Sequence, residues 1–216
     1  NEIKNRIRRL GSVNVDAIEE YKEVSERYEF LSAQVKDVEV SRADLLKLID
    51  ELTVQMRDIF IEQFRLINHH YGEVFSELFG GGKGELLLTE PEDVLHSGIE
   101  MRVQPPGKKI LNLEVLSGGE KALAAIALLF AILKVTPSPF CVLDEIEAAL
   151  DDVNVDRYAS YLRRMCDQSQ FIVITHRRGT MEEADVLYGV TMQEQGVSKL
   201  LELRASEVEQ KLGLSV

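Results

Sequence analysis

Apolar residues recur every seven positions through the first third of the chain. One series runs from Val24 to Ile59, and a second lies three residues earlier in each heptad, from Tyr21 to Met56. Two apolar series sustained over several heptads predict a coiled coil. We expect one helix over residues 16–79, roughly 90 to 100 Å long at about 1.5 Å per residue. Because such a helix is longer than the diameter of a small domain, the apolar stripe needs a partner helix to cover it.

Glycines and prolines divide the rest of the chain. Gly11 indicates a break in the arm, and the cluster from Gly80 to Gly84 ends the long helix. The predicted domains are a coiled-coil arm and neck over residues 1–79 and a globular domain over residues 80–216. We expect helices at 117–133, 153–166 and 205–212, and strands at 85–90, 99–104, 140–143, 171–174, 186–193 and 197–203.

Two of these strands indicate the type of sheet. The runs at 140–143 and 171–174 are short and continuously apolar, which is typical of parallel strands buried on both faces. The predicted fold class is therefore α/β, with a mostly parallel sheet flanked by helices, plus the long coiled-coil helix.

Composition narrows the possible functions. The formal net charge of −12 argues against an autonomous basic clamp for nucleic acid. Cys141 and Cys166 have no CxxC pairing and no histidine at ligand spacing, so neither a disulfide framework nor a zinc site is predicted. The longest apolar run, residues 122–133, is too short to cross a bilayer. A reducing, cytoplasmic compartment without membrane association fits these features best.

Three short segments bear candidate chemistry. Ser117, Gly118 and Gly119 open a helix, where backbone N–H groups and the helix dipole favour an anion such as a phosphate. Asp144-Glu145 and Thr175-His176 each follow a predicted buried strand, the edge at which open α/β sheets bind ligands.

Each of these segments also has a simpler interpretation. Ser-Gly-Gly is a common N-cap, an Asp-Glu pair is often a solvated strand end, and a single histidine is usually structural. The order of the three segments, with apolar strands between them, favours function. His69 and His70 lie on the long helix, and we interpret them as structural because no metal-binding partner is identified at i+4.

The segments together resemble those of ABC-type ATPases, and within that superfamily the SMC family. The signature motif, Walker B strand, D-loop and switch-histidine loop of ABC-type ATPases are similar to residues 116–123, 140–145, 148–151 and 174–176. The strings that resemble SMC proteins in particular lie at 10–14, 78–82, 104–109 and 179–192.

The chain departs from the family pattern because it has no P-loop. The one candidate, Gly80 to Lys83, has Glu77 in place of the first glycine of GxxxxGK(S/T) and Gly84 in place of the final Ser or Thr. In the family the P-loop lies in the N-terminal half of the head. The resemblance therefore implies that this chain is the C-terminal half of a bacterial SMC ATPase head with the adjoining coiled coil, and that it is inactive alone.

The resemblance also implies residue roles and partners. Asp144 is expected to hold Mg²⁺ through water, and Glu145 and His176 are expected to be catalytic. The residues expected to contact ATP on an opposing head are Ser117, Gly118, Gly119, Glu120 and Asp151. Expected partners are the N-terminal half of the same protein, a second SMC head in a homodimer, the winged-helix domain of a kleisin subunit, and DNA. The implied function is ATP-driven chromosome condensation and segregation at the bacterial nucleoid.

Three alternatives stay open. A coiled-coil ABC ATPase of DNA double-strand-break repair shares the signature and Walker B segments. A non-catalytic coiled-coil interaction module with an inert head is a different class, although it has no chemical need for Ser117, Glu145 and His176 together. An ABC transporter subunit fits less well, because such subunits lack a coiled-coil arm.

Overall fold

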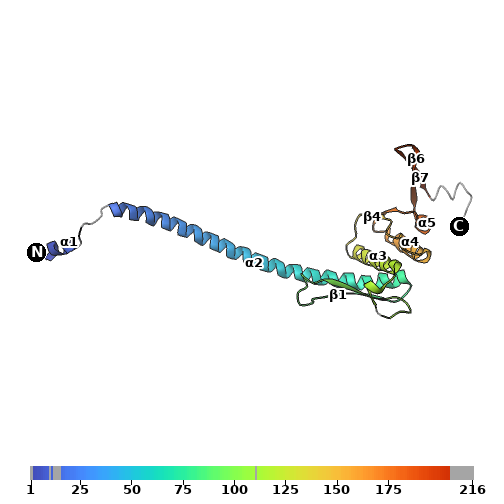
Figure 1. Ribbon diagram of the computed structural model, residues 1–216, viewed down its shortest axis with the longest axis horizontal. Helices are drawn as coiled ribbons and strands as arrows, with labels where there is room; N and C mark the ends of the chain where they lie inside the picture. Colours follow the sequence, from blue (N-terminus) through green and yellow to red (C-terminus); the bar gives the residue numbers. More distant parts are fainter. Residues whose placement is uncertain (1, 10, 12–15, 110, 205–216) are drawn as a thin grey trace, which may run out of the picture. The chain divides into compact units, whose positions relative to one another are not determined.

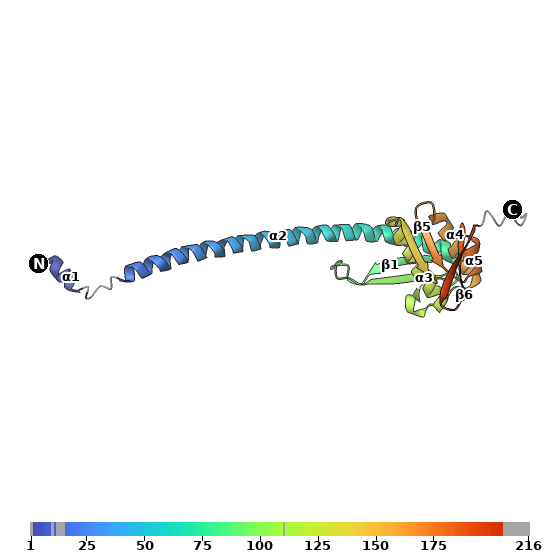
Figure 2. The same cartoon turned by 90° about the horizontal axis from the view of Figure 1, so that it is seen from above.

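The computed structural model describes residues 2–9, 11, 16–109 and 111–204. The chain separates into two compact units, residues 1–56 and 57–216, and two views show their elements (Figures 1 and 2). In the described residues of the first unit, α1 (Glu2–Arg9) precedes the start of α2 (Asp16–Phe79). No helix among the described residues is long and apolar enough to cross a membrane.

The long helix α2 has the predicted bounds, residues 16–79. It contains one glycine, Gly72, and no proline in 64 residues, so its backbone hydrogen bonds continue without a break. At its end Gly80 takes a left-handed φ of 69°. The Gly80 N–H donates to the Glu77 carbonyl at 3.3 Å and the Gly81 N–H to the Ser76 carbonyl at 2.7 Å. This Schellman pattern satisfies two of the last carbonyls and stops the helix.

Most of the apolar stripe on α2 is exposed. Val38 is 67% and Leu45 60% exposed, and the other heptad residues from Val24 to Ile59 are similar. Burial is limited to the last turns of the helix, at Tyr71, Val74, Phe75, Leu78 and Phe79. The helix is therefore as predicted, while its pairing into a coiled coil stays a prediction.

The core of the second unit lies where the end of α2 packs with α3 (Gly118–Val135) and α4 (Asp152–Met165). Phe130 of α3 stacks on Tyr158 and Tyr161 of α4, with ring centroids 5.9 and 5.2 Å apart. Small residues such as Ala124, Ala127 and Ala131 are buried along α3. Their small side chains let neighbouring elements approach the helix closely.

Seven strands form three small sheets among the described residues. The first sheet joins β1 (Lys83–Leu88), β2 (Ile99–Gln104) and β3 (Leu111–Asn112) in antiparallel order. The second pairs β4 (Phe140–Asp144) with β5 (Gln170–Ile174) in parallel. The third is an antiparallel hairpin of β6 (Val186–Glu194) and β7 (Val197–Arg204). The hairpin turns at Gln195-Gly196, as predicted.

The prediction of a mostly parallel sheet is wrong for this chain. Among the described strands only β4 and β5 are parallel, and α4 supplies the helical crossover that a parallel pair requires. The other neighbouring strands follow one another through turns or loops without a helix long enough for such a crossover. The α/β class itself is confirmed.

The prediction that β4 and β5 are buried on both faces is also wrong. Leu143 is buried, but Val142 is 54% and Ile172 49% exposed, and Phe140 and Ile174 are exposed on the same alternation. A continuous apolar run indicates that both faces need cover, and the described residues cover one of them.

Several short elements had no sequence signal. These are β3, the 3-10 helix η1 (Leu113–Val115) and α5 (Arg178–Glu182). The strand predicted at 85–90 begins two residues earlier, at Lys83. The predicted helix at 205–212 and most of the predicted break near Gly11 lie outside the described residues.

Candidate functional site

Two of the predicted segments meet at one edge of the parallel pair. In the β4–β5 register Asp144 pairs with Ile174, so Glu145 and Thr175 are the next residues along each strand. The Glu145 N–H donates to the Ile174 carbonyl at 3.0 Å and extends the ladder by one bond. The carboxyl ends of both strands therefore place Asp144, Glu145 and His176 together, as the sequence predicts.

Glu145 adopts a backbone conformation that side chains rarely take. Its φ is 47°, the one positive φ among the described non-glycine residues. A turn in which the Ala148 N–H donates to the Glu145 carbonyl at 3.0 Å holds this conformation. Such left-handed residues cost free energy and cluster at functional sites. The left-handed conformation of Glu145 turns the chain sharply at the end of β4, directly after Asp144.

The Glu145 carboxylate faces the His176 ring. Glu145 Oε1 is 3.4 Å from His176 Nδ1, and the two side chains are 55% and 62% exposed. Asp144 is exposed as well, so its carboxylate is open to a hydrated cation. An accessible carboxylate beside an imidazole suits proton transfer to or from a bound water.

Glu147 is a site residue that the sequence interpretation missed. Its side chain is fully buried. Its Oε1 accepts hydrogen bonds from the hydroxyls of Thr175 and Thr180, the latter at 3.1 Å. Thr175 immediately precedes His176, so the buried carboxylate fixes the start of the histidine loop. The available signal was an acid flanked by apolar residues two positions after Glu145.

Arg177 is a second missed residue. Its guanidinium donates to the Leu150 carbonyl at 2.9 Å and to Asp152 Oδ1 at 2.8 Å. Its N–H donates to the Thr175 hydroxyl at 3.0 Å. Arg177 therefore connects the histidine loop to residues 148–152, which lead from Glu145 into α4.

The start of α3 is a complete capping box. Glu120 N–H donates to Ser117 Oγ at 3.4 Å, and Ser117 N–H donates to Glu120 Oε2 at 3.1 Å. The Ser117 hydroxyl also donates to Glu120 Oε2, at 2.9 Å. Lys108 Nζ lies 2.7 Å from Glu120 Oε1 and holds the pKa of that carboxyl below its usual range. The simpler N-cap interpretation is thus correct locally, and a phosphate at Ser117 would have to share these bonds.

The beginning of α3 also approaches the segment before α4. A Cβ on Gly119 would lie 3.0 Å from the Ala149 carbonyl oxygen, so only glycine fits this approach without a shift. Asp151 caps α4, accepting from the Asn154 N–H at 2.9 Å. Asp144, Glu145 and His176 therefore lie at the carboxyl ends of β4 and β5, while Ser117 to Glu120 begin α3, with Gly119 close to the Ala149 carbonyl.

A family model and a curated relative each match this chain over most of its length. A family model described as RecF/RecN/SMC N terminal domain matches residues 14–199. The chromosome partition protein Smc of Bacillus subtilis (strain 168) is 56% identical over 208 residues, 96% of this chain and 18% of that protein. The chain belongs to the SMC family. This chain spans less than a fifth of the length of the Bacillus subtilis protein.

Solved SMC heads share the fold. The Smc head domain of Pyrococcus furiosus, with an extended coiled coil and bound to the C-terminal domain of ScpA, has a TM-score of 0.72 and 36% identity. That match covers 98% of this chain and 52% of the other. Another solved chain, described under ATP-driven dimerization and DNA-stimulated activation of SMC ATPases, has a TM-score of 0.64 and 39% identity. It is matched over 98% of its length by 74% of this chain.

The SMC expectation is therefore confirmed at the level of family and head fold. The expectation of a C-terminal half does not gain support from the family model, whose description names an N-terminal domain. It stays a proposal that rests on the order of the motifs in this chain.

Proposed function

We propose that this chain is the C-terminal half of an SMC ATPase head. With an N-terminal half that bears the P-loop, it binds and hydrolyses ATP between two engaged heads and so drives chromosome condensation and segregation in the bacterial cytoplasm. The observation that carries the proposal is the convergence of Asp144, Glu145 and His176 at the carboxyl ends of β4 and β5. A carboxylate for Mg²⁺ beside a group that can orient water, at the carboxyl ends of strands, is an arrangement that nucleotide-hydrolysing sites use.

Two observations favour the proposal that a second half, with the P-loop, completes this head. Residues 80–83, the one P-loop candidate, lead from the end of α2 into β1, whereas a P-loop leads from a strand into a helix. The open face of β4 and β5 presents Phe140, Val142, Ile172 and Ile174 to solvent. An apolar sheet face of this kind is stable when another layer covers it.

The proposed roles follow from the positions of the side chains. Asp144 would hold Mg²⁺ through water, since an exposed carboxylate beside a phosphate site suits that ion, which would neutralise charge on the phosphate oxygens. Glu145 would orient and deprotonate the attacking water, with His176 hydrogen-bonded beside it. Ser117, Gly118, Gly119, Glu120 and Asp151 would act toward ATP on the opposing head.

The proposed partners extend this layout. The exposed stripe on α2 would pair with the helix of the N-terminal half as a coiled coil. A kleisin subunit would bind near β6 and β7, as the Pyrococcus furiosus head is described bound to the C-terminal domain of ScpA. DNA would bind the full assembly. Identity of 56% to a chromosome partition protein favours this function over a repair ATPase.

Reconstitution of the head tests the proposal. The isolated chain should hydrolyse no ATP, and co-purification with the P-loop half should give steady turnover. In that head Glu145→Gln should keep ATP binding and abolish turnover, because an amide does not accept the proton of the attacking water. Sedimentation should then show a stable ATP-dependent dimer. Turnover by the isolated chain, or unchanged turnover in Glu145→Gln, would refute the proposal.

A further inference from the structure

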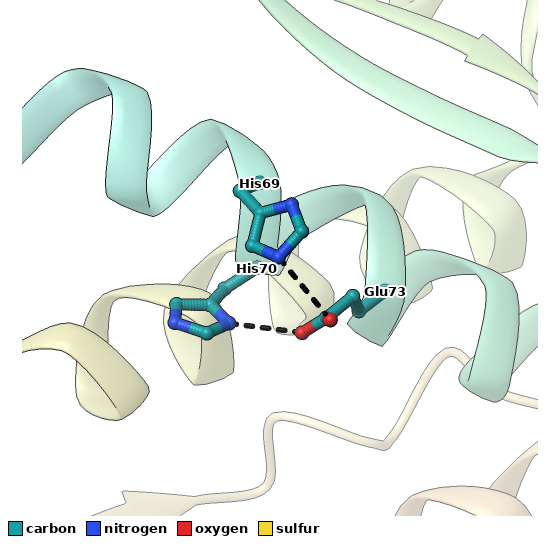
Figure 3. A group of neighbouring side chains, drawn as sticks. All are labelled: His69, His70 and Glu73. Carbon is teal, nitrogen blue, oxygen red and sulfur yellow. Dashed lines mark hydrogen bonds and ion pairs between the residues drawn. The ribbon is translucent and has the colours of Figure 1, made fainter.

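His69, His70 and Glu73 form a cluster on α2 near its buried end. His69 Nε2 is 3.4 Å from Glu73 Oε1, and His70 Nδ1 is 2.9 Å from Glu73 Oε2. Both imidazoles turn toward the carboxylate (Figure 3). One ligand atom from each residue lies within 4.8 Å of the other two. The interpretation of the histidines as structural overlooked Glu73, which stands at i+4 from His69 and i+3 from His70.

The spacing of the three ligand atoms suits one metal ion. Ligands held tetrahedrally at about 2.1 Å from Zn²⁺ lie about 3.4 Å from one another. The His69 distance of 3.4 Å ends on Glu73 Oε1 and the His70 distance of 2.9 Å on Glu73 Oε2, so the one carboxylate meets each ring at about that spacing through a different oxygen. The nitrogens of the two histidines need a side-chain rotation at most, because they too lie within 4.8 Å.

The donor set selects the class of metal. Two imidazole nitrogens and one carboxylate oxygen suit Zn²⁺ and similar divalent transition metals, whereas Mg²⁺ and Ca²⁺ prefer oxygen alone. The His69 side chain is 69% exposed, so water can complete the coordination. We propose that His69, His70 and Glu73 bind one divalent transition-metal ion, for which Zn²⁺ serves as the probe.

Lys134 opposes the metal at this site. Its Nζ, in the last turn of α3, lies 3.4 Å from Glu73 Oε2. The hydrogen bond to His70, followed by that to Lys134, lowers the pKa of Glu73 and keeps its carboxylate ionised and ready to bind. Metal binding exchanges the contact of Glu73 with α3 for a link between successive turns of α2. It also requires the proton of His70 to lie on Nε2.

Calorimetric titration of the tag-free 216-residue chain with Zn²⁺ tests the proposal. One ion should bind per chain near neutral pH. His69→Gln and Glu73→Gln should each weaken binding by more than about tenfold, because each removes one of three ligands. Lys134→Met should strengthen binding, since it removes the competing cation from Glu73.

Two matched controls make the result specific. His96 Nδ1 lies 3.0 Å from Asp93 Oδ1, a histidine–carboxylate pair for which the described residues offer no third ligand. His96→Gln should leave Zn²⁺ binding unchanged, as should Cys166→Ser, which removes an exposed thiol. Equal loss of binding in His96→Gln and His69→Gln, full binding in Glu73→Gln, or no binding at all would overturn the proposal. Circular dichroism checks that each variant is folded.

Discussion

At the scale of single residues, Glu147 connects the two segments of the candidate catalytic edge. One oxygen of its buried carboxylate accepts from Thr175 and Thr180, while Oε2 has no hydrogen-bond partner among the described residues. The Tyr158 hydroxyl is buried and without a partner in the same sense. Burial, with the nearby charge of Glu147, raises the pKa of Tyr158. A buried carboxyl group that depends on two threonines makes each of them sensitive to substitution.

The two threonines provide a matched test of this connection in a reconstituted head. Thr175→Val and Thr180→Val each remove one hydroxyl from the same carboxylate oxygen. Each should lower the free energy of unfolding by about 1 to 3 kcal/mol. Only Thr175→Val should also lower kcat with KM unchanged, because Thr175 precedes His176 and also accepts from the Arg177 N–H.

Urea unfolding and steady-state kinetics measure the two effects separately. If kcat falls equally in both variants, Glu147 has a structural role and does not position the histidine loop. Glu147→Gln is the conservative variant. Its amide oxygen still accepts from both threonines, so Glu147→Gln should keep most of the turnover that Thr175→Val loses.

The sequence predicted the exposed members of the site better than the buried ones. Asp144, Glu145 and His176 follow apolar runs that are visible locally. Glu147 and Arg177 depend on partners that are distant in sequence, 28 residues away at Thr175 and 27 at Leu150. A pairing across that separation exists only after β4 and β5 have been aligned. No local pattern reports it.

At the scale of elements, periodicity fixed boundaries where many residues agree and failed where few do. The bounds of α2 were predicted closely because the heptads from Val24 to Ile59 and a glycine stop at its end indicate one helix. The two-residue strand β3 and the five-residue helix α5 are too short to show a period. Coverage of β4 and β5 was misjudged because a strand's sequence shows which faces are apolar, but not whether this chain covers them.

The stop of α2 gives a prediction for this scale. Gly80→Ala should lower the free energy of unfolding by about 1 to 2 kcal/mol for the left-handed backbone alone. The new Cβ would also lie 2.9 Å from an Arg157 guanidinium nitrogen, which adds a further loss. Gly107→Ala is the control, since Gly107 has a similar φ of 76° with open space around its Cβ position.

Urea unfolding of both variants separates backbone strain from crowding. Gly107→Ala should show the strain alone, and Gly80→Ala a larger loss. Equal losses in the two variants would mean that Arg157 moves aside freely. No loss in Gly80→Ala would mean that the Schellman pattern does not stabilise the end of α2.

At the scale of the whole molecule, the candidate site residues form two groups with different surroundings. Glu145 and His176 contact each other at the carboxyl ends of β4 and β5. Ser117 contacts Glu120 at the start of α3, and no described bond joins it to the first group. The proposed function assigns the two groups to two different nucleotides. A dimer of heads with two-fold symmetry provides this arrangement, because each head then contributes one group to each site.

Substitution of Ser117 tests that arrangement. In a reconstituted head, Ser117→Arg places a bulky cation where the proposal requires a small hydroxyl and close backbone approach. ATP binding by the monomer should survive, because the P-loop and Asp144 of that head are unchanged, while dimerisation and turnover should be lost.

Mixing this variant with a P-loop variant leaves one intact composite site in each mixed dimer. Activity should recover to at most about a quarter of wild type, since half of the dimers are mixed and each has one working site of two. Nucleotide binding to monomers and turnover of the mixture are the two measurements. Loss of monomer binding in Ser117→Arg would place the serine in the site of its own head and contradict the two-head arrangement.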